Sequence, residues 1–123
     1  GNSPSIMTTL ALLPTTTYGT PSGNYNGSST SFVGNAVPAA NYYGGQGSVQ
    51  TLTFTVANLT ATLTTQATLN DDPTQPFWFD IYTLTGNATS NTVTNSPIGN
   101  FSWLRVAVTN FTAGNITVAT VTY

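Results

Sequence analysis

Residues 49–69 read "VQTLTFTVANLTATLTTQATL", and this stretch decides the fold class. Apolar side chains alternate with threonines and one glutamine along it. The apolar positions are Leu52, Phe54 and Val56 in the first part and Ala61, Leu63, Ala67 and Leu69 in the second. A period of two is typical of a strand with one buried face. We therefore predict two strands, joined by a hairpin connection at "NLT", residues 58–60.

Three later stretches are also typical of strands: "FWFDIYTLT" at 77–85, "FSWLRVAVTNF" at 101–111 and "ITVATVTY" at 116–123. In the first of them both faces are apolar, which is typical of a central strand or of one that a partner covers. Turn-forming residues separate these strands. We expect a turn at "TAGN", 112–115, and a loop over 86–100 with a short strand at Val93.

The N-terminal part is less regular. Residues 6–13, "IMTTLALL", read as a strand ended by Pro14, and they are too few for a membrane span, which takes about 20 apolar residues. Residues 14–48 are rich in Gly, Ser, Thr, Asn and Pro. Because such a long structureless loop is uncommon in a compact domain, we expect short edge strands in it, or an arm ordered by a partner.

These patterns predict an all-β fold, an antiparallel β-sandwich or jelly roll of about seven to nine strands. One domain fits the length: an N-terminal strand or arm at 1–13, a long polar segment with short edge strands at 14–48, and a sandwich core at 49–123. Cysteine is absent, so stability must come from packing or assembly.

The charged residues exclude most chemistry. The chain has no His, no Cys and a single basic residue, Arg105, and its only acids are Asp71, Asp72 and Asp80. We expect no enzyme activity, no catalytic residue and no cofactor, since general acid–base groups are nearly missing. Asp71 and Asp72 fit a solvated turn better than a calcium or other metal site. One arginine cannot neutralise phosphates, which argues against nucleic-acid binding; no membrane partner is expected either.

Arg105 lies in a strand, on the face opposite Leu104 and Val106. Asp80 occupies a similar place in "FWFDIY". A half-buried arginine needs a partner, so we expect Arg105 to pair with Asp80 or to pack over Trp103. This pair would mark strand register or an interface rather than catalysis.

Aromatic side chains form a second candidate set: Tyr42, Tyr43, Trp78, Tyr82 and Trp103. Aromatic residues dominate the energetics of cores and interfaces, and a core or subunit-interface role is the favoured interpretation. A platform on which a glycan stacks is the alternative.

N-x-Ser/Thr triplets occur at Asn26, Asn58, Asn87, Asn100, Asn110 and Asn115. They are the acceptor motif for N-glycosylation in secreted proteins. Their number is close to the chance expectation for a chain so rich in Asn, Ser and Thr, and chance is the favoured interpretation.

The chain from residue 41 onward resembles a family through "NYYGGQGSVQTLTFTVANLTATLTTQATLNDDP", "FWFDIY" and "GNFSWLRVAVTNFTAGNITVATV". It is similar to small virion structural proteins of tailed marine phages, including cyanophages. The resemblance implies a β-sandwich on the surface of an extracellular virion, as a capsid decoration protein or a neck, tail or fibre component. It carries no catalytic residue to transfer.

We therefore expect a non-enzymatic capsid decoration protein that binds the major capsid protein or another virion protein, and that forms a homo-oligomer. A glycan- or receptor-binding module of a phage fibre or bacterial surface protein is one alternative. A subunit of a secreted filament is another, with residues 6–13 as a strand donated to a neighbour.

Overall fold

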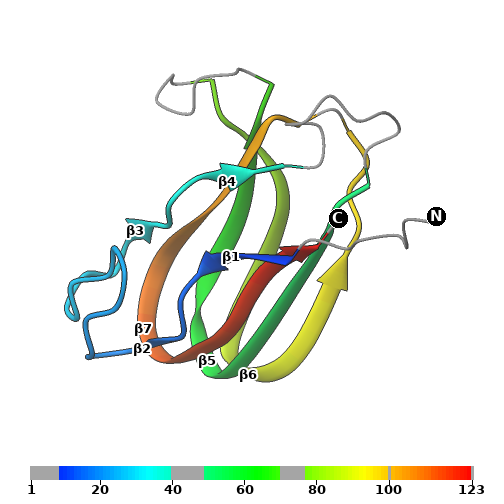
Figure 1. Cartoon of the computed structure of the whole chain (residues 1–123). Helices are drawn as coiled ribbons and strands as arrows, with labels where there is room; N and C mark the ends of the chain where they lie inside the picture. Colours follow the sequence, from blue (N-terminus) through cyan, green and yellow to red (C-terminus); the bar gives the residue numbers. More distant parts are fainter. Residues whose placement is uncertain (1–8, 40–48, 70–76, 100, 123) are drawn as a thin grey trace, which may run out of the picture.

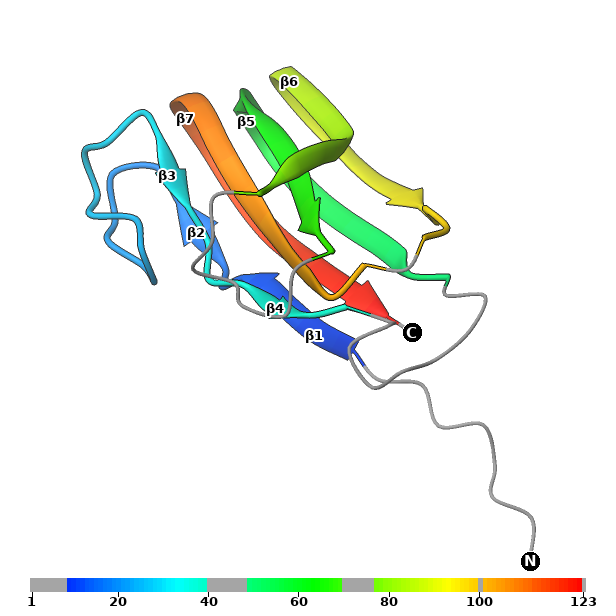
Figure 2. The same cartoon turned by 90° about the horizontal axis from the view of Figure 1, so that it is seen from above.

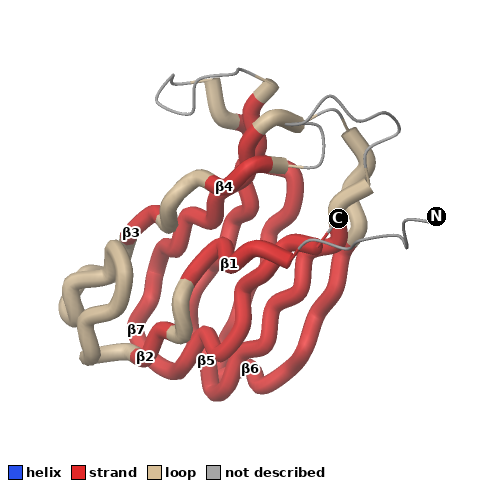
Figure 3. Tube along the Cα trace, viewed as in Figure 1, coloured by secondary structure: helices blue, strands red, loops and turns tan. Residues whose placement is uncertain are grey.

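The computed structural model describes residues 9–39, 49–69, 77–99 and 101–122. Every regular element in these ranges is a strand (Figure 3). The strands are β1 Thr9–Leu13, β2 Thr16–Thr17, β3 Phe32–Val33, β4 Val37–Pro38, β5 Thr51–Thr68, β6 Phe79–Asn95 and β7 Trp103–Thr122. They form one antiparallel seven-stranded sheet, which confirms the predicted all-β antiparallel class. The described residues contain no helix long and apolar enough to cross a membrane.

The order across the sheet is β1-β7-β5-β6, and β2, β3 and β4 also pair with β7. The N-terminal chain thus runs backwards along the outer edge of β7, from Thr122 beside β1 to Trp103 beside β4. Figure 2 shows this arrangement from above, with β3 and β6 on opposite sides of β7 and β5. The described part of the polar segment 14–48 belongs to this edge.

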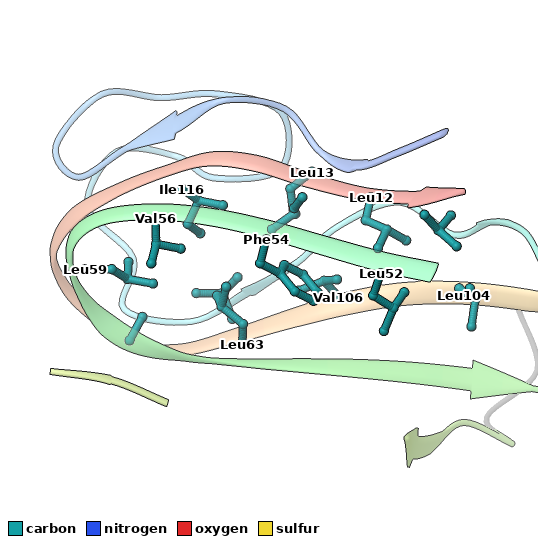
Figure 4. Packing of buried hydrophobic residues seen from close by; sticks show 14 of the residues in the cluster. Leu12, Leu13, Leu52, Phe54, Val56, Leu59, Leu63, Leu104, Val106 and Ile116 are labelled. Carbon is teal, nitrogen blue, oxygen red and sulfur yellow. The ribbon is translucent and has the colours of Figure 1, made fainter. Parts of the chain in front are cut away.

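The three long strands bend back on themselves, so that one sheet makes both layers of the sandwich (Figures 1 and 4). One layer, the Arg105 layer, contains residues 61–68, 79–86 and 103–109 of β5, β6 and β7. The other, the Thr55 layer, contains residues 51–57, 89–95 and 116–122. The predicted hairpin at 58–60 and the predicted turn at 112–115 are therefore wrong, because β5 and β7 continue through them. The loop expected at 86–100 is wrong as far as Asn95, where β6 ends, and the short strand expected at Val93 is part of β6.

Left-handed backbone makes the bends. Asn58 in β5, Ala88 in β6 and Asn110 in β7 have φ near +50°, and Gly114 has φ of 94°. Asn tolerates this region better than most residues, and Gly adopts it freely. The N-x-Thr triplets that begin at Asn58 and Asn110 thus coincide with bends.

Hydroxyl groups hold the bends together across strands. Thr60 Oγ1 accepts a hydrogen bond from the backbone N–H of Ala88 at 3.1 Å. Ser90 Oγ accepts one from the N–H of Asn58 at 2.9 Å. These bonds satisfy backbone donors that leave the regular ladder where it shifts register.

The register shifts also keep the apolar face inside. Val56 and Leu59 are both buried although they are three residues apart, because the bend at Asn58 inserts one extra residue. Strict alternation would have turned Leu59 outward. Leu69, which the alternation placed on the core face, lies beyond the end of β5 and is exposed.

The core fills the space between the two layers (Figure 4). Its largest fully buried apolar side chains are Leu12, Tyr25, Leu52, Phe54, Leu59, Leu63, Leu104, Val106, Val108, Phe111 and Ile116. Burial of one such side chain contributes roughly 1.5–3 kcal/mol. At the bend of β7, Phe111 packs against Tyr18, Tyr25 and Phe32, so the loop 18–31 is tied to the domain by aromatic contacts.

Candidate functional site

The outer face of the Arg105 layer carries the polar cluster. Gln66 lies in the middle strand, opposite Asp80 of β6 on one side and Arg105 of β7 on the other. Arg105 Nε donates to Gln66 Oε1 at 2.8 Å. Gln66 Nε2 donates to Asp80 Oδ1 at 3.1 Å. The side-chain amide of Gln66 therefore links the guanidinium of Arg105 to the carboxylate of Asp80 through two hydrogen bonds.

Arg105 also packs on an aromatic ring. Its guanidinium carbon lies 4.2 Å from the ring centroid of Trp78, the residue just before β6. This distance is well within the range of a cation–π contact. Partial burial lowers the pKa of Arg105 from its ordinary value, because burial disfavours the charged form. Arginine nevertheless stays charged at neutral pH.

The expected Asp80–Arg105 pair is therefore corrected to a three-residue chain through Gln66. The reason is the sheet order: β5 lies between β6 and β7, so the two charges stand two strands apart. The alternative expectation, that Arg105 packs over Trp103, is also replaced, since the guanidinium reaches across β5 to Trp78. The strand order identifies Gln66 as the residue between Asp80 and Arg105. Local alternation alone does not give the strand order.

Strict alternation along "FWFDIY" predicts that Tyr82 lies on the same face as Trp78 and Asp80, but the structure places it on the other face. The pairs Thr65–Tyr82 and Gln66–Asp80 leave Ile81 as an extra residue in β6. This bulge reverses the alternation, and Tyr82 turns inward. Its ring stacks on that of Phe54, with centroids 6.0 Å apart. Tyr82 is therefore a core-facing side chain and no part of an outer platform.

Trp103 stands on the outer face of β7, opposite Thr68 and two residues before Arg105. Trp78 and Trp103 are both half-buried. The remaining aromatic candidates, Tyr42 and Tyr43, lie outside the described residues, as do Asp71 and Asp72.

The second feature of interest is the edge of the sheet formed by β6. Within the described ranges, β6 pairs with β5 on one side only, and no strand of these ranges pairs with β6 on its other side. Over 17 residues β6 contains a single charged side chain, Asp80, and no proline. Only Gly86 of this strand is fully buried. An edge strand presents backbone N–H and C=O groups that no neighbouring strand pairs. Two N–H groups of β6 are bonded to its own side chains, that of Asn87 to Thr89 Oγ1 at 3.0 Å and that of Thr92 to Asn91 Oδ1 at 2.9 Å.

Exposed apolar side chains gather at the open end of the sandwich, where β6 begins and ends. Phe77 and Phe79, 62% and 41% exposed, lie at the start of the strand. Together with Thr68 and Leu69 they line an open groove of about 370 Å³. Ile98, just beyond the other end of β6, is 73% exposed and pairs with Val49 in an isolated bridge.

The polar cluster consists of one carboxylate, one amide and one guanidinium. A nucleophile needs an adjacent base, and Arg105, Gln66 and Asp80 supply neither a nucleophilic hydroxyl or thiol nor an imidazole. In the part of the chain that the structure describes, no three His, Cys, Asp or Glu residues gather as metal ligands do. The cluster is suited to hydrogen bonding and stacking.

Comparisons with protein-family models, with curated proteins and with solved structures found no match to this chain.

Proposed function

We propose that the protein is a non-enzymatic structural component of a virion, most specifically a capsid decoration protein that binds the major capsid protein and stabilises the capsid surface. The observation that carries the proposal is the unprotected edge of β6, together with the apolar side chains at its two ends. Natural edge strands are usually short or carry lysine, proline or inward-pointing charges, which prevent unwanted pairing.

A protein that lives assembled has less need of these devices, because neighbours cover its edges. The chain has a formal net charge of −2 and 3% charged residues, so its surface opposes association only weakly. The resemblance of residues 41–123 to small virion proteins of tailed marine phages supports the same function.

Quantitative mass spectrometry of purified virions from the phage that carries this sequence tests the proposal. A copy number close to that of the major capsid protein, or a simple fraction of it set by the lattice, is the expected result. A few copies per virion would contradict decoration and indicate the neck, tail or fibre. Absence of the chain from purified virions would overturn the virion function as a whole.

Glycan binding is a second candidate, favoured by the outer face of the Arg105 layer. There Trp78 offers an aromatic ring, and Gln66, Asp80 and Arg105 offer donors and acceptors within one cluster. Aromatic faces stack on sugar rings, and such polar groups bond their hydroxyls. The test is a glycan array with wild type and Trp78→Ala; Tyr82→Phe is the control, because Tyr82 faces the core. Signal lost in Trp78→Ala but kept in Tyr82→Phe supports binding here, and a blank wild-type array contradicts it.

A further inference from the structure

We propose that the free edge of β6 pairs with β6 of a second copy of this chain, about a two-fold axis that runs through the bend of the strand. The proposal rests on the function proposed above, in that both assign the β6 edge to assembly, and it names the partner. The product would be a closed dimer in which both layers of the sandwich continue from one copy into the other.

The bend of β6 makes this symmetry possible. Ala88, where the backbone turns, lies near the middle of Phe79–Asn95, so the strand has two legs of similar length, 79–86 and 89–95. The legs run in opposite directions, one in each layer (Figure 1). A half-turn about an axis through the bend exchanges the legs. Each leg then meets the other leg of the second copy in the antiparallel sense that a ladder needs.

The side-chain pattern of β6 fits this pairing. The positions on the core side are known from their partners in β5: Tyr82 and Leu84 in one leg, Asn91 and Val93 in the other. Asn91 itself is exposed, and its Oδ1 accepts a hydrogen bond from the backbone N–H of Thr92 at 2.9 Å, a bond that the pairing would have to replace. When Leu84 is set opposite Asn91 of the second copy, Tyr82 falls opposite Val93. Gly86 then meets Thr89, so core-facing positions meet core-facing positions in both legs. A register shifted by one residue would place core-facing residues opposite outward-facing ones.

The outward-facing residues are also compatible in that register. Thr83 lies opposite Thr92 of the second copy, and Thr85 lies opposite Ser90. Threonine and serine pairs already join strands within one chain, as between Thr55 and Thr92, whose hydroxyl oxygens are 3.1 Å apart. Asp80 is the one charged residue of β6, and in this register it lies near Thr94 of the second copy. No like charge is therefore placed opposite it.

The apolar ends of the edge would cover each other. The open end of one leg holds Phe77 and Phe79, and the open end of the other continues to Ile98. Exchange of the legs brings the phenylalanines of one copy beside residues 95–98 of the second. Large apolar side chains that are exposed in one chain would thus be shielded twice, once at each end of the interface.

A pair of substitutions tests partner and register together. Thr83 and Thr92 are exposed and lie in different layers, so they do not meet within one chain. Thr83→Lys with Thr92→Lys sets lysine against lysine twice in the dimer. Thr83→Lys with Thr92→Glu, the matched control, sets lysine against glutamate at the same two places. Light scattering after size exclusion at low salt, where charges are least screened, measures the mass.

We expect wild type and the Lys/Glu variant to have twice the mass of one chain. The Lys/Lys variant should dissociate about tenfold more readily, since each like-charge pair opposes association. Circular dichroism checks that all three proteins are folded. A monomeric wild type, or equal dissociation of both variants, would overturn the proposal. So would masses above the dimer, which would indicate that β6 docks on the β1–β4 edge in an open filament.

Disulfide formation gives an independent readout of register. The chain has no cysteine, so Thr83→Cys with Thr92→Cys introduces its only thiols. Directly opposed positions in antiparallel strands are close enough for a disulfide. Mild oxidation should cross-link the double variant to a covalent dimer, whereas either single variant should stay unlinked. No dimer from the double variant would overturn the register.

Failure of the dimer and failure of the virion function can be told apart. Co-sedimentation of the Lys/Lys variant with decoration-free capsids measures particle binding separately from self-association. A wild-type monomer that still co-sediments would refute the dimer alone. A dimer that does not co-sediment, and is missing from virions, would refute the virion function alone.

Discussion

The two edges of the sheet differ in how they are protected. The edge beyond β7 is built from the short strands β1 to β4. Pro14 and the loop 18–31 separate some of these strands, and β4 itself contains Pro38. The edge at β6 is one long strand with neither proline nor lysine. Short strands and prolines are the usual protection against edge-to-edge association. Within the described residues, one edge has this protection and the other lacks it, as the proposed assembly through β6 would require.

Burial follows the same division. β7 lies between β5 and the N-terminal strands, and its core-facing residues are almost all fully buried. The core-facing residues of β6, such as Tyr82 and Leu84, are only half-buried although they touch the same core. Stability within one chain should therefore depend much more on β7 than on β6.

The largest expected effect tests that contrast directly. Leu104→Ala in β7 should lower the free energy of unfolding by about 3–4 kcal/mol, as for a fully buried leucine. Leu84→Ala in β6 should cost about 1–2 kcal/mol when the protein is monomeric, because its side chain is half-exposed. Urea unfolding of both variants in the Lys/Lys background measures the difference. Equal losses would contradict the contrast.

The bend of β7 should be nearly as sensitive. Gly114 has φ of 94°, and a methyl group added there would overlap the backbone of Asn58 and Leu59 in the neighbouring strand. We expect Gly114→Ala to cost about 2–3 kcal/mol, since steric overlap adds to the penalty for left-handed backbone. Gly19→Ala is the control, because φ there is 88° but nothing lies within 4 Å. Thermal unfolding measures both variants. If Gly19→Ala lowers stability as much as Gly114→Ala, the left-handed backbone accounts for the whole effect and steric overlap adds nothing.

Replacing a threonine inside the sandwich should raise stability. Thr65 is buried between Tyr82 of β6 and Val106 of β7, and its hydroxyl has no hydrogen-bond partner among the described residues. Valine has almost the same shape and removes the unsatisfied group. We expect Thr65→Val to raise the free energy of unfolding by about 1 kcal/mol, and Thr64→Val, on the outer face, to change it by less than about 0.5 kcal/mol. Destabilisation by Thr65→Val in urea titrations would show that the hydroxyl is satisfied.

The outer cluster should give the smallest effects. Arg105→Met removes the contact with Trp78 and the bond to Gln66 and should cost about 1 kcal/mol. Asp80→Asn keeps an acceptor for Gln66 on an exposed residue and should change stability by less than about 0.5 kcal/mol. A double-mutant cycle measured by chemical unfolding checks this. If Arg105 and Asp80 are still strongly coupled when Gln66 is replaced by leucine, the two residues interact directly as an ion pair, contrary to this account.

Much of the fold follows from local pattern, and the bends do not. The alternation in 51–56 and 61–67 predicts strands with the correct buried face, because burial of one face is a property of neighbouring residues. Whether "NLT" closes a hairpin or bends a continuous strand depends on which strands lie beside it. Asn58 belongs to the predicted hairpin connection, and its left-handed backbone is compatible with both outcomes. Asn110 lies inside the predicted strand 101–111, where the alternation gives no sign of a bend.

Local alternation predicts only part of the candidate site, because the rest depends on which strands are neighbours. Alternation predicts that Arg105 and Asp80 lie opposite the core-facing residues of their strands, and the register confirms this. Alternation gives the wrong face for Tyr82, because the bulge at Ile81 shifts the register. No glycine or proline near Ile81 indicates this bulge in the sequence. Gln66 was missed because its role comes from the strand order, which no short stretch of sequence contains.

Hydrogen exchange of the β6 backbone amides tests most directly whether this edge is the assembly surface. In the wild-type protein at concentrations where it is assembled, the account predicts slow exchange along all of β6, as along β7. In the Lys/Lys variant, amides of β6 that point away from β5 should exchange fast, while those of β7 stay protected. Fast exchange at those β6 positions in the assembled wild type would contradict the account, because the edge would then still face solvent.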